Sequence, residues 1–161
     1  MMAEFDPKEH KFPVSLYFDD LSLGEKYYIP SRTLGDANFA AFQMASADNH
    51  PIHYDVEYCR ARGYPNLLAH GFQVLIQTVA GAGNLPHVLS ASMIAFIEQT
   101  SKFLGPVYAG DTVYPELEII TLKPQRTTGV VVLRSTVHNQ RRELVLEGTQ
   151  TYLVRKREGA E

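Results

Sequence analysis

The longest apolar stretch of the chain covers residues 71–82, and its apolar positions recur with the period of an α-helix. These positions are Phe72, Val74, Leu75, Ile76 and Val79. Only Gln73 and Gln77 form a polar stripe, four residues apart, so the predicted helix is nearly surrounded by protein. Gly81 and Gly83 are expected to end it. The pattern therefore predicts a buried helix at the centre of the fold.

The second half of the chain alternates apolar and polar positions with the period of a β-strand. Strands are predicted over residues 92–103, 112–122, 127–138 and 144–154. One parity of the first strand holds Met93, Ala95, Ile97 and Phe103. The second alternates apolar and acidic residues, in the order Val113, Glu116, Leu117, Glu118 and Ile119. Helices followed by hairpin-linked strands are typical of the α+β class.

Shorter elements are predicted before the central helix. Residues 26–34 favour an edge strand, because they are rich in strand formers and contain a proline. Asp36 is expected to cap a helix over residues 38–44, and Asp55 is expected to cap another over residues 56–62.

Length and composition indicate one soluble domain. The chain has 161 residues, of which 45% are hydrophobic and 20% are charged. We expect a flexible N-terminal segment over residues 1–14, a domain over residues 15–155 and a C-terminal tail over residues 156–161. The net charge is only −3, and the chain lacks the basic patch that a nucleic-acid partner would require.

Cys59 is the only cysteine, so an intramolecular disulfide is impossible. This fits a reducing compartment, and a small packed residue is the favoured role for Cys59. Charged residues interrupt every long apolar stretch, and the N-terminus lacks the apolar core of a secretory signal. We therefore expect a cytoplasmic protein with no membrane partner.

Candidate chemistry gathers in residues 46–55. Asp48, His50 and His53 fall within six positions, and Pro51 disfavours helix between the two histidines. A carboxylate beside an imidazole, which titrates near neutrality, can form an acid/base pair. The residues alone leave open a solvated turn with no chemical role.

This loop resembles the signature of the MaoC-like dehydratases and (R)-specific enoyl-CoA hydratases, a branch of the hotdog-fold superfamily. That signature reads approximately Gly-Asp-x-Asn-Pro-(Leu/Ile/Val)-His. The matching residues here are Ala47, Asp48, Asn49, His50, Pro51, Ile52 and His53, with Cys59 as a later small residue. Two positions depart, because Ala47 replaces the glycine and His50 the asparagine. Residues 62–64, 68–71 and 105–112 continue the similarity, which covers about residues 15 to 155 and is strongest to the small NodN-like branch.

The resemblance implies a single hotdog domain, with an antiparallel sheet wrapped around a long central helix. It also implies reversible hydration of a 2-enoyl thioester to a 3-hydroxyacyl thioester, without metal or redox cofactor. Asp48 and His53 fall on the catalytic pair, and we take Asp48 as the favoured base, although the two roles can be exchanged. The N–H of Gly71, at the start of the central helix, is the candidate donor to the thioester carbonyl oxygen.

His50 and His70 are expected to contribute to substrate binding. His70 falls where it could line the pantetheine path, although a histidine that is hydrogen-bonded near a helix start is the favoured alternative. A metal site built from His50, His53 and His70 is disfavoured, because their spacing matches no zinc motif. We therefore predict no metal.

The resemblance implies a homodimer or a higher homo-oligomer, with the first long strand or the central helix at the two-fold interface. Two other functions stay open. A hotdog thioesterase would need a carboxylate on the central helix, where residues 71–84 hold no Asp or Glu. A non-catalytic acyl-thioester-binding or assembly protein fits the departures at Ala47 and His50. Acyl chain length, and the choice between coenzyme A and acyl carrier protein, leave no motif in the sequence.

Overall fold

An antiparallel sheet of six strands forms the body of the molecule in the computed structural model, which describes residues 5–10 and 15–159. The strands are β1 (Lys26–Tyr28), β2 (Arg32–Thr33), β3 (Met93–Phe103), β4 (Thr112–Pro124), β5 (Thr128–Asn139) and β6 (Leu144–Arg155). Their order is β1-β4-β5-β6-β3, and β2 also pairs with β4. The four long strands that the alternating pattern predicts are confirmed.

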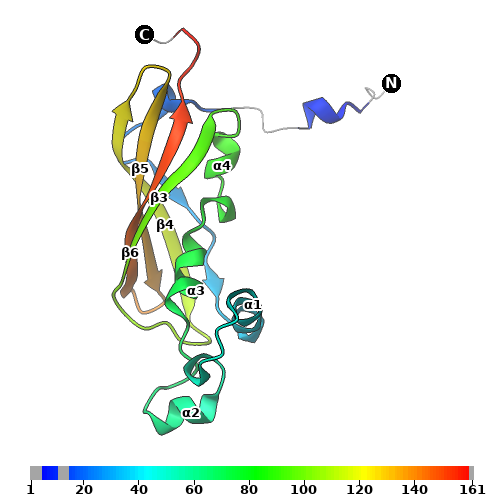
Figure 1. Ribbon diagram of the computed structural model, residues 1–161, viewed down its shortest axis with the longest axis vertical. Helices are drawn as coiled ribbons and strands as arrows, with labels where there is room; N and C mark the ends of the chain where they lie inside the picture. Colours follow the sequence, from blue (N-terminus) through cyan, green and yellow to red (C-terminus); the bar gives the residue numbers. More distant parts are fainter. Residues whose placement is uncertain (1–4, 11–14, 160–161) are drawn as a thin grey trace.

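Short helices cover one side of this sheet and one of its ends. The α-helices are α1 (Asp36–Ser46), α2 (Val56–Ala61), α3 (Gly71–Leu75) and α4 (Leu85–Val88). The 3-10 helices are η1 (Pro7–Glu9), η2 (Phe18–Asp20), η3 (Pro51–His53), η4 (Ile76–Thr78) and η5 (Ala80–Ala82). Figure 1 shows α3 and α4 along the sheet, with α1 and α2 at the end opposite the last residues of β6. The order of elements is the expected α+β one.

The predicted long central helix is broken into short pieces. Val79 is extended, with φ −59° and ψ 126°, and separates η4 from η5. The side-chain amide of Gln150 in β6 donates to the carbonyl oxygen of Thr78 at 2.9 Å. In a continuous α-helix that oxygen would accept from the N–H of Ala82, which here donates to Val79 O at 3.0 Å. A side chain from the sheet therefore replaces a bond of the helix, and the layer continues as single turns.

Burial along β4 follows the predicted alternation. Val113, Leu117 and Ile119 are at most 1% exposed, whereas Glu116 and Glu118 lie on the opposite, less buried face of the strand. The prediction for β3 is wrong at two positions, because Ile97 is 53% exposed and Phe103 is 50% exposed. Ile97 lies at a register shift between Phe96 and Glu98. A bulge disturbs the alternation of side chains locally, and the sequence pattern carries no sign of it.

An apolar cluster packs beneath the loops at the α1 end of the sheet. It contains Leu34, Phe39, Ala69, Val74, Val107, Val113, Val137, Val145 and Leu146. Ala69 N–H donates to Val107 O at 2.8 Å, so the segment before α3 is fixed to the segment before β4. The cluster and this hydrogen bond therefore fix the position of the residues that follow Ala69.

The predicted starts of the two N-terminal helices have different outcomes. Asp55 caps α2 as expected, with its carboxylate accepting from the Tyr58 N–H at 3.0 Å. Asp36 is the first residue of α1 and not its cap, a role that falls to Gly35, whose N–H donates to Asn38 Oδ1 at 3.0 Å. Both helices nevertheless form close to the predicted positions.

The predicted terminal segments lie partly outside the described residues, which omit 1–4, 11–14 and 160–161. Within the N-terminal segment, Pro7–Glu9 form η1. Within the C-terminal tail, the Arg157 N–H donates to Asp19 Oδ2 at 3.0 Å. The flexibility of both segments stays a prediction.

Cys59 is fully buried, and its Sγ donates to the Ile52 carbonyl oxygen at 3.1 Å, which confirms its packing role. In the part of the chain that the structure describes, none of the helices has the length and apolarity needed to cross a membrane.

Candidate active site

The loop that carries Asp48 begins with a sharp change of backbone direction at the end of α1. Ala47 adopts the left-handed conformation, with φ 57°, and its N–H donates to Gln43 O at 2.9 Å. Glycine occupies such positions at little cost, and the resembling signature has glycine here. The left-handed turn therefore forms in spite of the alanine, and Asp48 is the first residue after it.

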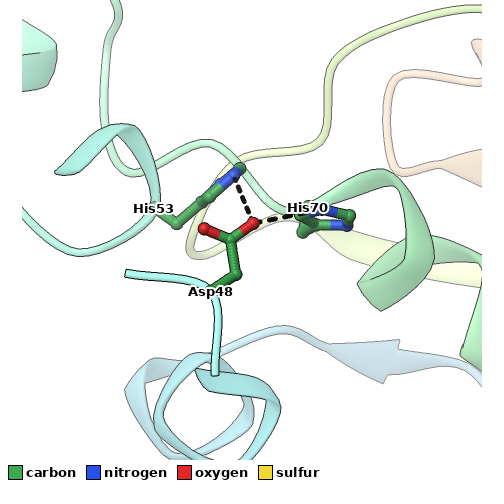
Figure 2. A group of neighbouring side chains, drawn as sticks. All are labelled: Asp48, His53 and His70. Atoms are coloured by element: carbon green, nitrogen blue, oxygen red, sulfur yellow. Dashed lines mark ion pairs between the residues drawn. The ribbon is translucent and has the colours of Figure 1, made fainter. Parts of the chain in front are cut away.

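The carboxylate of Asp48 lies between two imidazole rings. Its Oδ2 is 3.2 Å from His70 Nε2 and 4.0 Å from His53 Nε2. Figure 2 marks both contacts with dashed lines. Its Oδ1 accepts from the His50 backbone N–H at 2.9 Å. That N–H lowers the pKa of Asp48 most, partial burial opposes it, and the nearby imidazoles lower the pKa further. Asp48 is therefore an ionised carboxylate at neutral pH.

His53 is oriented by a backbone carbonyl. The side chain is buried in η3, and Nδ1 lies 2.6 Å from Leu68 O. Because a carbonyl oxygen only accepts, Nδ1 carries the proton that it shares with Leu68. In the neutral ring, Nε2 is then left with a lone pair, and this atom faces Asp48. His53 is arranged to accept a proton at Nε2.

His70 has the opposite arrangement of its ring nitrogens. It is the N-cap of α3, and Nδ1 accepts from the Phe72 N–H at 3.0 Å. In the neutral ring the proton is therefore on Nε2, the atom 3.2 Å from Asp48 Oδ2. The ring also packs against Phe42 and Phe72, with centroid distances of 5.3 and 5.4 Å. Protein groups thus lie against both of its nitrogens.

One oxygen of Asp48 and one nitrogen each of His53 and His70 lie within 4.8 Å of one another, close enough to suggest a metal site. A metal needs a lone pair from every ligand, and metal-bound imidazoles donate through their other nitrogen. His53 meets this condition, but Nδ1 of His70 accepts from Phe72 and Nε2 holds the proton. The donor set therefore suits acid/base chemistry and does not fit a metal ion.

Gly71 opens α3 beside this cluster. Its N–H has no acceptor among the described residues, as expected for the first turn of a helix. A Cβ built on Gly71 would lie 3.1 Å from the ring of Phe103. The glycine thus leaves room for a group to approach the N–H between the helix start and the end of β3.

The predicted site residues do not all gather at this point. The structure brings Asp48, His53 and His70 together. The ring of His50 is exposed, and its centroid lies 5.8 Å from that of the Tyr58 ring. Its Nδ1 accepts from the Ile52 N–H at 3.3 Å. Only its backbone N–H reaches Asp48. Substrate contacts of His50 and His70 stay predictions.

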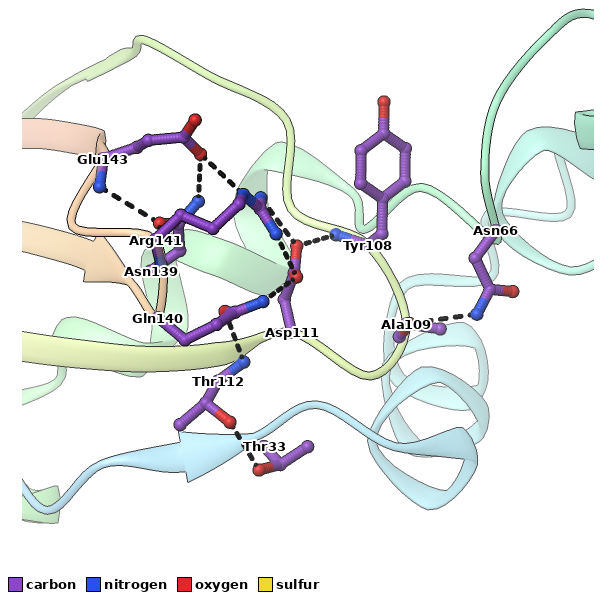
Figure 3. A network of polar contacts seen from close by, with 10 residues as sticks. All are labelled: Thr33, Asn66, Tyr108, Ala109, Asp111, Thr112, Asn139, Gln140, Arg141 and Glu143. Atoms are coloured by element: carbon purple, nitrogen blue, oxygen red, sulfur yellow. Dashed lines mark hydrogen bonds and ion pairs between the residues drawn. The ribbon is translucent and has the colours of Figure 1, made fainter.

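A polar network that the sequence did not suggest holds the segment carrying Leu68 and His70. Ala109 N–H donates to Leu67 O at 2.9 Å, which extends the pairing at Ala69. The turn after Ala109 is held by buried Asp111, which accepts from Arg141 Nη1 and from the Tyr108 N–H, each at 2.9 Å (Figure 3). Asp111 and Arg141 are 30 residues apart, so no local motif could have found them.

Comparison with known proteins assigns the family. The model of the MaoC like domain matches residues 20–140. A 3-hydroxybutyryl-CoA dehydratase of Methylorubrum extorquens is 28% identical over 91% of this chain and 88% of its own length. An (R)-specific enoyl-CoA hydratase of Rhodospirillum rubrum is 26% identical over 86% of this chain and 91% of its own length.

Comparison with solved structures identifies the fold. A Mycobacterium tuberculosis protein with a double hotdog fold superposes with a TM-score of 0.75 and 26% identity, over 91% of this chain and 46% of that one. One such unit therefore corresponds to this single domain, and the hotdog prediction is confirmed. With three quarters of its length matched by the family model, this chain belongs to the MaoC-like dehydratase family.

Proposed function

We propose that this protein catalyses the reversible hydration of a 2-enoyl thioester to a 3-hydroxyacyl thioester. Family membership supports a hydro-lyase, and the named relatives act as a dehydratase and a hydratase. The observation that carries the proposal is the 4.0 Å separation between Asp48 Oδ2 and His53 Nε2. Two acceptors at that separation can both hydrogen-bond one water molecule at about 2.8 Å.

The positions of the protons on Asp48 and His53 favour His53 as the base. Asp48 has a lowered pKa, so its carboxylate is a weak proton acceptor at neutral pH and serves to hold the water. The lone pair on His53 Nε2 removes a proton from that water as its oxygen bonds to C3 of the substrate. The sequence favoured Asp48 as the base; we assign both proton transfers to His53 instead, and the bond from His53 to Leu68 supports this.

The same residues complete the addition. As the C3–O bond forms, the π electrons of the double bond move towards the thioester carbonyl, whose oxygen accepts from the Gly71 N–H. The imidazolium of His53 then returns its proton to C2, which restores the neutral ring. One water is added, and no electrons are exchanged with a cofactor.

The acyl chain of the substrate has an apolar path beside the helical layer. A groove of about 390 Å³ is lined by residues that include Leu75, Ile76, Val79, Met93 and Phe96. Leu75 is one helical turn, about 6 Å, beyond Gly71. A thioester of coenzyme A or of acyl carrier protein that is bound at Gly71 can therefore extend its acyl chain into this groove.

The outer edge of β3 supports the proposal of a homodimer. β3 is the last strand of the sheet order and carries half-exposed Ile94, Phe96, Ile97 and Phe103. A long apolar edge strand is stable in water when another chain covers it. We propose that a second copy does so around a two-fold axis.

A panel of thioesters tests the reaction class. Crotonyl-CoA and longer enoyl-CoA substrates should lose their enoyl-thioester absorbance with the wild-type protein, without release of free thiol. Release of thiol would instead establish a thioesterase. Tight binding without either change would establish a non-catalytic acyl-thioester-binding protein, and both outcomes contradict the proposal.

A further inference from the structure

We propose that His70 is a positioning residue that fixes the Asp48 carboxylate against the start of α3. This inference rests on the proposed hydratase function. It assigns His70 a role between two protein groups. This agrees with the hydrogen bond near a helix start that the sequence favoured over a substrate contact. His70 lies 3.2 Å from Asp48 through Nε2 and accepts from the Phe72 N–H through Nδ1.

The two nitrogens of His70 perform different tasks. Nδ1 satisfies one of the N–H groups that the first turn of a helix leaves without a partner. That bond fixes the neutral ring in the form that carries its proton on Nε2. The proton then lies towards the negatively charged oxygen of Asp48. Capping of the helix thus determines which polar group the carboxylate meets.

This arrangement connects the two halves of the reaction site. Asp48 belongs to the loop after α1, whereas Gly71, the candidate donor to the thioester oxygen, belongs to α3. His70 is the side chain that touches both the carboxylate and the first turn of α3. Rings of Phe42 and Phe72 hold the imidazole in place. The distance between the water held by Asp48 and the thioester is therefore set through His70.

His70 also directs the use of the two carboxylate oxygens. Oδ1 accepts from the His50 N–H, whereas Oδ2 lies 4.0 Å from His53 Nε2 and is the oxygen that can share a water with the base. Oδ2 is also the oxygen that lies near both Nε2 atoms. Without the N–H of His70, the carboxylate can rotate about its terminal bond and move the water. A misplacement of about 1 Å can lower a rate on the order of 10²-fold.

Two substitutions separate the tasks of the ring nitrogens. In His70→Asn, the side-chain oxygen can cap α3 in place of Nδ1, but it cannot reach Asp48. In His70→Gln, the longer side chain places an N–H near the position of Nε2 and leaves the cap poorly satisfied. We expect kcat of His70→Asn to fall on the order of 10-fold to 100-fold at nearly unchanged KM and thermal stability. His70→Gln should keep kcat within about threefold and melt at a lower temperature than wild type, because its cap is poorly satisfied.

Equal kcat in His70→Asn and wild type would overturn the proposal, as would an equal loss of kcat in both variants. An independent readout uses ¹⁵N NMR of the wild-type imidazoles. We expect His70 to be protonated at Nε2 and His53 at Nδ1. A His70 proton on Nδ1 would also overturn the proposal. This measurement needs no substrate, so it distinguishes a wrong role for His70 from a wild-type protein that hydrates no thioester.

Discussion

The side chain of His53 and the carbonyl oxygen of Leu68 form a 2.6 Å hydrogen bond that determines the chemistry of the proposed catalytic pair. The bond places one proton on Nδ1 and leaves the Nε2 lone pair towards Asp48. Orientation of a base by a second group is a recurrent feature of acid/base sites. Here that group is the backbone carbonyl of Leu68. The hydrogen bonds from Ala69 to Val107 and from Ala109 to Leu67 hold the segment that carries it.

Asp111 should stabilise the fold in a pH-dependent manner. Burial would raise its pKa, but hydrogen bonds from Arg141, Gln140 and the Tyr108 N–H outweigh this and lower the pKa below its ordinary value. A lowered folded-state pKa gives stability that is present above the unfolded-state pKa and lost as the pH falls through the folded value. Asp111→Asn should cost about 1 to 3 kcal/mol at pH 7, and this cost should shrink in melting experiments near pH 2.

The exposed pair of Arg134 and Glu118, on the neighbouring strands β5 and β4, supplies the matched control for Asp111. Glu118→Gln should cost less than about 1 kcal/mol, because exposed ion pairs contribute little. Equal costs at the two sites, or a cost for Asp111→Asn that does not change with pH, would contradict the assignment.

Ala47→Gly should stabilise the protein by about 1 kcal/mol, because glycine adopts the left-handed φ of 57° without strain. Ala45 lies in the same helix with helical backbone and an exposed side chain. Ala45→Gly should therefore destabilise by about 1 kcal/mol. Chemical denaturation measures both changes in stability, which should have opposite signs. Equal signs would contradict strain at Ala47.

Gly71→Ala should lower kcat/KM by about tenfold or more, because the new methyl group narrows the approach to the N–H against Phe103. The half-exposed ring of Phe103 can move, so we expect little change in melting temperature. Gly105→Ala is the control, since its Cβ would meet only ordinary contacts of 3.6 Å or more. Unchanged kinetics of Gly71→Ala would remove Gly71 from the proposed site.

Ile97→Glu should convert the proposed dimer into a monomer. Ile97 is 53% exposed on the edge strand β3, so a charge there costs the single chain little and opposes burial against a second copy. Sedimentation equilibrium measures the mass of both forms. A monomeric wild-type protein at micromolar concentration would show that β3 is not a self-association edge.

Local patterns predicted the parts of the fold that depend on local physics. The two-residue period of β4 gave its buried face, with Leu117 and Ile119 at most 1% exposed. The central helix was predicted too long, because its interruption depends on Gln150, which is 72 residues from Thr78. The exposure of Ile97 depends on a bulge in its pairing with β6. Neither contact has a local signature.

The candidate site shows the same division. Spacing and resemblance identified Asp48 and His53, and the structure brings them together with His70. The atoms that orient these side chains are Leu68 O and the Phe72 N–H, which are backbone groups. Any residue type supplies such groups, so sequence alone could not assign a tautomer or a base.

The most direct test compares the rates of crotonyl-CoA hydration by wild type, His53→Gln and Asp48→Asn, with the exposed His138 replaced in the control His138→Gln. We expect kcat to fall by about 10²-fold or more in His53→Gln and Asp48→Asn and to be unchanged in His138→Gln. Calorimetry with a saturated acyl-CoA should show that all four proteins bind ligand. Full activity of His53→Gln, or no hydration by wild type across short and long enoyl thioesters, would contradict hydration by the Asp48–His53 pair.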